Sequence, residues 1–331
     1  MARCVALLSG GLDSLLAIRI LQQQDVEIEA VNFKTVFTCC QDRSAQAARE
    51  LNVPLTVITQ EDDYLDVIRR PRFGYGKGAN PCIDCRIYMF RRARQFMEQI
   101  GADFVASGEV LGQRPKSQKR WDLDVIAYHA GLEELLLRPL SAKLMPITAP
   151  EREGLVDRDR LYGFTGRGRK GLIQLARQLG LRTIPHPSTG CALTEPRFSQ
   201  KMFDLMQCCP AAGRWDFELL KLGRHFRFDQ AVKVVVGRRE AENDQLEHMH
   251  AAAEASSTAA LKPADYAGAS ALVVGPLSDA VLRFAGGLLW RYGKLDGRDA
   301  AQVQVIERER TWTMQIQPLT DTQRISTLAG V

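Results

Sequence analysis

The sequence predicts an α/β protein, a parallel sheet flanked by helices, followed by a smaller α+β domain. Three observations predict this class. The 331 residues are enough for about two domains. Short apolar runs alternate with amphipathic stretches over the first two hundred residues, as strands and helices do in a parallel sheet. Beyond Pro210–Gly213 the pattern changes. We therefore expect two domains, residues 1–213 and residues 214–331.

Each element of the first domain follows from a local pattern. Arg3–Leu8 is an apolar run that ends in Ser-Gly-Gly, so it predicts a buried strand. Apolar residues at helical spacing predict a helix over 14–23. The same criteria predict strands at 27–33, 54–58, 103–106 and 135–140, and helices at 42–51, 82–100, 168–179 and 196–206. Ligands of such sheets bind beyond the C-terminal ends of the strands. The loops after Leu8, Phe33 and Ala106 are therefore the candidate site.

The second domain is predicted in the same way. Strands are expected at 232–236 and 271–274, helices at 240–253 and 278–292, and a hairpin at 303–307 and 311–316. Between them, Ala251–Ala260 has the low-complexity sequence AAAEASSTAA and predicts a connector.

Composition excludes several classes of protein. Hydrophobic residues make up 45% and charged residues 25%, which excludes overall disorder and a fibrous repeat. The absence of a long apolar run or a signal peptide predicts a cytoplasmic protein without a membrane partner. The net charge is +5, and the residues from Asp216 onward hold 14 basic and 15 acidic side chains. The excess of positive charge therefore lies in the N-terminal part and is compatible with a nucleic-acid partner.

The turn after the first strand has the sequence Ser9-Gly10-Gly11-Leu12-Asp13-Ser14. Its glycines allow N–H groups to converge, and the following helix directs its positive dipole end at the same point. This predicts a cradle for phosphate or pyrophosphate, in which Asp13 holds Mg²⁺ or caps the helix. A plain glycine-rich turn with a helix cap is the alternative. The Walker pattern GxxxxGK followed by Ser or Thr is absent.

Three of the eight cysteines stand in motifs. Asn80-Pro81-Cys82-Ile83-Asp84-Cys85-Arg86 places two thiols one helical turn apart, where the helix dipole and Arg86 are expected to lower their pKa values. Cys191 follows a glycine in a polar loop and is the candidate third ligand. Three thiolates suit a [4Fe–4S] cluster. Zinc with His186, a redox-active pair and ordinary structural cysteines are the alternatives. The vicinal pair Cys39–Cys40 is a weaker candidate for carrying sulfur.

These motifs together resemble known families. SGGLDS resembles the pyrophosphatase loop of the PP-loop ATPases, which have an adenine nucleotide alpha hydrolase-like fold. The stretch from Ser107 to Gln118, SGEVLGQRPKSQ, resembles the tRNA 4-thiouridine synthetases. NPCIDC and STGC resemble the three-cysteine pattern of iron–sulfur-dependent tRNA 2-thiouridylase relatives. The resemblance covers about residues 3–205 and implies that ATP is bound by the matching residues Ser9, Gly10, Gly11, Asp13, Ser14, Phe33, Gly108, Glu109 and Gln113.

The resemblance implies an ATP-dependent tRNA sulfurtransferase that adenylates a base carbonyl, that of uridine, and replaces its oxygen with sulfur. Asp13, Cys85 and Cys191 are the implied catalytic residues. Cys82, Cys85 and Cys191 are the implied ligands of a [4Fe–4S] cluster, with zinc as the alternative. The implied partners are Mg²⁺, tRNA and a sulfur donor, which is either free sulfide or a persulfide carrier. A homodimer is one arrangement compatible with this interpretation. A PP-loop amide ligase with structural zinc and a non-catalytic RNA-binding factor are the alternative functions.

The second domain carries a resemblance of its own. Arg224-His225-Phe226-Arg227 and the turn Val236-Gly237-Arg238-Arg239 resemble the RNA-binding domain of the NFACT proteins. The resemblance implies phosphate contacts by Arg238 and Arg239, and base stacking on Phe226 or Phe228. A plain α+β interaction domain is the alternative.

Overall fold

The computed structural model describes residues 1–37, 43–185, 191–295, 297–308, 310–319 and 327–328. The chain divides into two compact units, Met1–Cys191 and Ala192–Val331. This boundary lies before the expected one at 213/214, because helix α8 (Pro196–Cys208) packs with the second unit. Asp204 on α8 pairs with Arg227 at 2.6 Å, and Lys201 Nζ donates to the Gly223 carbonyl at 3.2 Å.

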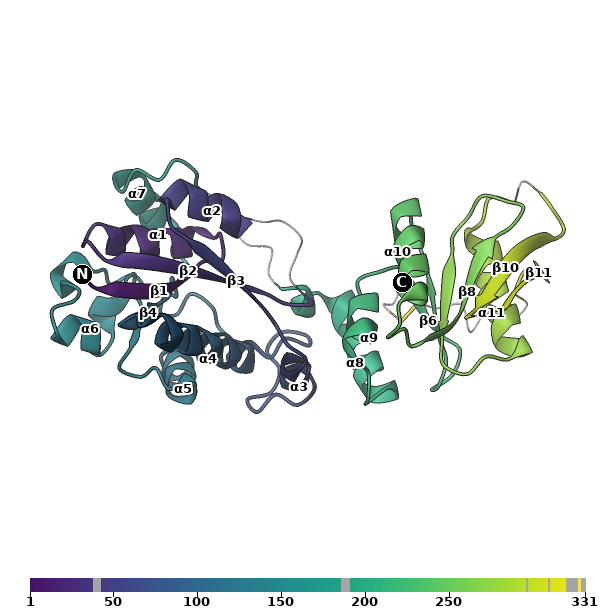
Figure 1. The fold of residues 1–331 in the computed structure, drawn as a ribbon, viewed down its shortest axis with the longest axis horizontal. Helices are drawn as coiled ribbons and strands as arrows, with labels where there is room; N and C mark the ends of the chain where they lie inside the picture. Colours follow the sequence, from purple (N-terminus) through teal and green to yellow (C-terminus); the bar gives the residue numbers. More distant parts are fainter. Residues whose placement is uncertain (38–42, 186–190, 296, 309, 320–326, 329–331) are drawn as a thin grey trace. The chain divides into compact units, whose positions relative to one another are not determined.

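The first unit contains, in its described residues, a five-stranded parallel sheet with the order β3-β2-β1-β4-β5 (Figure 1). Its strands are β1 (Arg3–Leu7), β2 (Glu27–Lys34), β3 (Leu55–Thr59), β4 (Phe104–Ala106) and β5 (Leu136–Leu137). Its helices are α1 (Leu12–Gln22), α2 (Arg43–Leu51), α3 (Asp63–Arg69), α4 (Cys82–Ile100), α5 (Arg120–Ala130), α6 (Ala149–Arg152) and α7 (Lys170–Gln178). The predicted fold class of this unit is confirmed.

Helices cover both faces of this sheet, because strands such as β1 and β4 bury consecutive residues, and these point to opposite faces. Successive side chains of a strand point to opposite faces. Cys4 and Ala6 of β1 therefore pack in a core with α1, α2 and α7, whereas Val5 packs in another with α4 and α5. Figure 1 shows the sheet between these two helical layers. The loops at the C-terminal ends of β1 and β4 emerge at the same edge, because the strands are parallel neighbours.

The second unit is built on an antiparallel sheet of six strands in its described residues, with the order β11-β10-β8-β9-β7-β6. Its strands are β6 (Arg224–Arg227), β7 (Lys233–Val236), β8 (Ser257–Pro263), β9 (Ala271–Val274), β10 (Ala301–Glu307) and β11 (Arg310–Ile316). Besides α8 it contains α9 (Arg214–Leu219), α10 (Glu240–Ala251) and α11 (Asp279–Tyr292). One core lies between the sheet and α11, and a smaller one involves α9 and α10.

The expectation that Ala251–Ala260 is a connector is wrong. Its second half begins β8, which pairs with both β9 and β10 inside the sheet. Ala259 packs in the α11 core and Ala260 in the α10 core, so both faces of the strand are buried. The small side chains let two helices approach the sheet closely. The same small residues give the segment its low-complexity composition, which hides the strand in the sequence. Among the described residues, no helix is long and apolar enough to span a bilayer.

Candidate functional site

The turn between β1 and α1 is shaped for an anion. Gly10 has a φ of +73°, and a Cβ there would stand 2.7 Å from the Arg43 carbonyl carbon, so the site requires glycine. The Ser9 and Ser14 hydroxyl oxygens lie 3.2 Å apart, and Ser14 Oγ donates to the Gly11 carbonyl at 2.8 Å. Gly11 is the N-cap of α1 and provides no side-chain cap. The first N–H groups of the helix are therefore open to a ligand at the positive end of its dipole.

The loop that follows β4 packs directly against this turn. A Cβ on Gly108 would stand 2.4 Å from the Asp13 carbonyl carbon and 2.5 Å from the Ser14 nitrogen. Only a residue without a side chain permits this approach, because the two atoms belong to backbone that cannot move aside. Gly108 thus places the predicted ATP-binding loop beside the start of α1.

The Asp13 side chain contacts the same loop, the one that follows β4. Gln113 hydrogen-bonds to the Asp13 carboxylate, and Arg169 and Arg114 lie within electrostatic range of it. Burial raises the pKa of Asp13 above its ordinary value, although these three neighbours oppose the shift. A half-buried carboxylate beside a phosphate cradle is chemically suited to bind Mg²⁺. The structure therefore brings Asp13 and Gln113 together, as the sequence predicts.

Glu109, in the loop after β4, forms buried ion pairs at this edge of the sheet. It is 3% exposed, and Arg86 Nη1 contacts its Oε1 at 2.7 Å while Arg138 Nε contacts its Oε2 at 3.0 Å. Arg138 is itself 5% exposed. Both carboxylate oxygens are engaged, so Glu109 orients two arginines below the site. Its direct contact with ATP stays a prediction.

Arg114 joins the nucleotide loops to the cysteines. It lies within electrostatic range of Asp13, Cys82, Arg86 and Glu109, which come from three different segments. In the sequence this residue stood out only as one of several cations in a basic loop. Arg114 directly follows Gln113, a predicted ATP-binding residue, and this position is the signal that could have identified it as a site residue.

Cys82 and Cys85 lie on the first turn of α4, as predicted. Cys85 Sγ accepts a hydrogen bond from the Tyr64 hydroxyl at 3.2 Å. Burial raises the pKa values of both thiols above their ordinary range, although Arg86 acts in the opposite direction. The expected lowering of these pKa values is therefore wrong, because removal of the thiols from water outweighs the nearby positive charge.

Cys191 ends the first unit close to this cysteine pair. Its charge acts on the Tyr64 hydroxyl, the same group that donates to Cys85. Across the described part of the chain, however, no three His, Cys, Asp or Glu side chains are arranged to hold a metal ion. The three-cysteine metal site thus stays a prediction. Cys39–Cys40 and His186 lie outside the described residues.

The aromatic side chains predicted to contact adenine or an RNA base are largely covered by protein. Phe33 is 6% exposed and packs in the core with Phe90, so most of its ring is covered by protein. Its role at the ATP site stays a prediction. Phe226 is fully buried, so the expectation that it stacks on a base is wrong. Phe228 packs against Phe284, with the ring centroids 5.4 Å apart.

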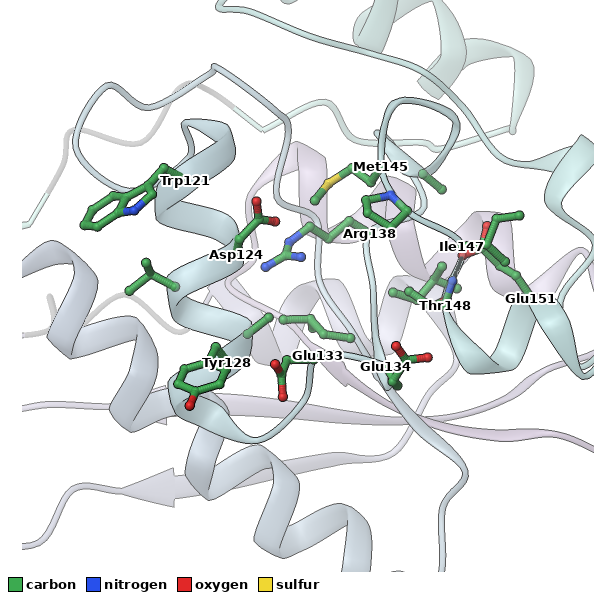
Figure 2. A pocket seen from close by; sticks show the side chains of 16 residues that line it. Trp121, Asp124, Tyr128, Glu133, Glu134, Arg138, Met145, Ile147, Thr148 and Glu151 are labelled. Carbon is green, nitrogen blue, oxygen red and sulfur yellow. Dashed lines mark hydrogen bonds between the residues drawn. The ribbon is translucent and has the colours of Figure 1, made fainter.

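A hollow of about 510 Å³ lies next to the buried pair of Glu109 and Arg138 (Figure 2). Trp121, Asp124 and Tyr128 line it from α5, and Figure 2 shows Arg138 near Asp124. Among the described residues that line it, Arg138 alone is basic, and its guanidinium is already held by Glu109. This hollow is therefore poorly suited to a phosphate, and the nucleotide site is best assigned to the loops around Asp13.

Comparisons with known proteins divide along the same two units. Residues 2–128 match the family model of the tRNA methyl transferase HUP domain, and residues 223–327 match that of the NFACT protein RNA binding domain. The tRNA-specific 2-thiouridylase MnmA of Sulfurimonas denitrificans is 30% identical over 113 residues, which cover 31% of this chain and 33% of that protein. MnmA of Trichlorobacter lovleyi is 28% identical over 121 residues, or 34% of each chain.

The chain matches about a third of the length of these curated relatives. A solved complex of a 4-thiouridine synthetase with RNA and bound ATP is similar over 54% of this chain and 41% of its own, with 23% identity and a TM-score of 0.39. The two family matches and the relatives confirm both resemblances that the motifs predict. Residues 2–128 of the first unit are thus similar to the tRNA methyl transferase HUP domain, and residues 223–327 of the second to the NFACT protein RNA binding domain.

Proposed function

We propose that this protein is an ATP-dependent tRNA sulfurtransferase that acts on uridine. One observation above all supports the proposal: Arg114 lies within range of both Asp13, at the phosphate cradle, and Cys82, in the thiol pair. A phosphate cradle and a thiol pair that both lie within electrostatic range of one arginine suit a reaction that first activates a base and then delivers sulfur to it. The identified relatives are named as tRNA 2-thiouridylases, which agrees with this reaction.

In the first step, the uracil carbonyl oxygen attacks the α-phosphate of ATP, and pyrophosphate leaves into the Ser9–Ser14 turn. Free N–H groups at the start of α1 and the Arg114 guanidinium stabilise the charge that develops on the phosphates. Asp13 is the residue that would hold Mg²⁺, which would polarise the phosphate oxygens. Activation is needed because a carbonyl oxygen leaves poorly, whereas AMP leaves readily.

In the second step, sulfur displaces AMP from the activated base. In the persulfide route, the terminal sulfur of a persulfide on Cys85 or Cys191 forms the new C–S bond. A second cysteine thiol then attacks the bridging S–S bond, which frees the thiolated base and leaves a protein disulfide for an external thiol to reduce. In this route the outer sulfur comes from a persulfide carrier: the cysteine thiolate attacks it and the carrier leaves as a thiolate. Free sulfide, the other candidate donor, would instead attack the activated carbon directly, forming the C–S bond as the C–O bond to AMP breaks.

A [4Fe–4S] cluster on Cys82, Cys85 and Cys191 is the finer alternative, with zinc as a second. Three thiols are appropriate donors for either group. The described residues form no three-ligand set, and the reaction above is written for the cysteine thiols. Iron and sulfide analysis of anaerobically purified protein separates these cases: about four irons per chain in the wild type, lost in Cys82→Ala, would establish the cluster.

The decisive experiment measures thionucleosides by mass spectrometry in tRNA from a strain that lacks this protein. We expect one thiouridine to disappear, and to return with the wild type and with Cys209→Ala, whose cysteine is exposed and outside the predicted site. Cys191→Ala should not restore it. Unchanged thionucleosides in the deletion strain would contradict the proposal. ATP–pyrophosphate exchange that depends on a small carboxylic acid instead of tRNA would then favour the amide ligase.

A further inference from the structure

The second unit contains a basic cavity of about 520 Å³ where the N-terminal part of α8 meets the turn between α9 and β6. Five basic side chains line it: Arg197, Lys201, Lys221, Arg224 and Arg238. Three of these, Arg197, Lys201 and Lys221, precede the stretch 223–327 that matches the NFACT RNA-binding domain. The cavity therefore combines that domain with helices that this chain adds in front of it.

These cations are incompletely neutralised. Among the described residues that line the cavity, Glu195 is the one carboxylate, and it accepts the Phe198 N–H at 2.7 Å as the cap of α8. Arg238 is paired with Glu242 at 2.7 Å. Arg197 and Lys221 form no ion pair with any described residue. A concave surface with this surplus of positive charge concentrates the field and attracts anions.

Lys201 is held inside the cavity rather than in solvent. Its Nζ donates to the carbonyls of Leu220 and Gly223 at 3.3 and 3.2 Å, which leaves one of its three N–H donors for a ligand. Burial, followed by the charge of Arg238, lowers the pKa of Lys201 to about 8. An anion in the cavity would relieve this crowding of like charges.

His225 adds an independent observation. It lines the cavity, is 1% exposed, and its Nε2 lies 2.9 Å from the Leu222 carbonyl. A carbonyl can only accept, so Nε2 carries the proton and Nδ1 is a lone-pair acceptor. Nδ1 is buried and has no hydrogen-bond partner among the described residues. A ligand with a negative charge and a hydroxyl donor would pair with the surplus cations and with the unpartnered Nδ1 of His225.

We propose that this cavity binds a phosphate group of RNA, with Arg197, Lys201 and Lys221 as its cationic contacts. A ribose hydroxyl next to the phosphate provides the donor that His225 Nδ1 lacks. The phosphate is either a diester of the backbone or a terminal monoester. The ligand class rests on the proposed function, in which RNA is the substrate, but the site lies wholly within the second unit.

The test uses the full chain and fluorescence anisotropy, without ATP or a sulfur source. The probes are two labelled 12-nucleotide RNAs of identical sequence, one with a 5′-phosphate and one with a 5′-hydroxyl. Arg197→Gln and Lys221→Gln should each weaken binding about tenfold and reduce the salt dependence by about one charge. Arg283→Gln, an exposed arginine on α11 away from the cavity, is the matched control and should bind like the wild type.

The outcomes separate the two phosphate sources. Equal losses with both RNAs assign the cavity to a backbone phosphodiester, and a loss confined to the 5′-phosphorylated RNA assigns it to a terminal phosphate. Wild-type affinity of both variants for both RNAs would overturn the proposal. Failure of the proposed function is distinguished by a separate readout, tRNA-dependent AMP formation, which does not depend on this binding result.

Discussion

The two units both place positive charge where an anion is expected, but they do so differently. In the first unit the charge is fixed within a network: Arg86 and Arg138 share Glu109, while Arg114 and Arg169 face Asp13. In the second unit the described residues that line the cavity include five cations and one carboxylate, so much of their charge is unbalanced. The first arrangement suits precise alignment of a reacting nucleotide, whereas the second suits binding of an anion without chemistry. This difference can be tested in each unit separately.

The largest effect is expected on stability, at the buried pair of the first unit. Glu109→Ala should lower the free energy of unfolding of that unit by about 3–5 kcal/mol, because two arginines, one of them 5% exposed, lose their counter-charge. The measurement is urea unfolding followed by circular dichroism.

Asp204→Ala is the matched variant in the second unit. Its pair with Arg227 is more exposed, with side chains 14% and 18% accessible, so a loss of only about 1 kcal/mol is expected. Equal losses for the two variants would contradict the claim that the first unit relies more heavily on a fixed charge network.

The next effect is on catalysis. Arg114→Ala should reduce tRNA-dependent AMP formation about a hundredfold, because a preorganised cation beside the phosphates is lost. Arg177→Ala, an exposed arginine on α7 of the same unit, is the control and should leave the rate unchanged. A full rate in Arg114→Ala would remove the main support for a shared nucleotide and sulfur site.

A smaller effect should follow from the close approach of the two site loops. Gly108→Ala would force a Cβ to within 2.4 Å of the Asp13 backbone, so we expect a loss of about 1–3 kcal/mol in unfolding free energy and weaker ATP binding. Gly168→Ala is the control, because a Cβ at that position would meet no atom within 4 Å and the φ of Gly168 is not positive. Both are measured by thermal unfolding with and without ATP. Identical behaviour would show that the loops are free to separate.

Sequence patterns predicted the parallel sheet well, because each of its strands is a short segment with several apolar residues that is bounded by a turn or a helix. The same patterns do not predict β8. Its core residues include small alanines, which are buried because helices pack close to the sheet there. Sequence patterns also placed SGGLDS and CxxC correctly on their helices, since both motifs are local. The partnership of Arg114 with Asp13 and Cys82, and the cavity around Lys201, depend on contacts between distant segments. No periodicity in the sequence reports such contacts.

The smallest expected effect is a pH dependence confined to the second unit. Lys201, whose pKa is about 8, is charged below that pH and neutral above it, whereas a 5′-phosphate is already fully ionised above pH 7. RNA affinity should therefore fall a few-fold as the pH rises from about 7 to 9.5. In the unfolded chain Lys201 keeps its proton to higher pH, so the stability of this unit should rise over the same interval. Binding and stability should thus change in opposite directions in the wild type. In Lys201→Gln the fall in affinity should be absent and the rise in stability smaller, because Lys233, whose pKa is also lowered by burial, still contributes to the rise. A decline in affinity that persists in Lys201→Gln would show that another group titrates, and the cavity would no longer account for the pH dependence.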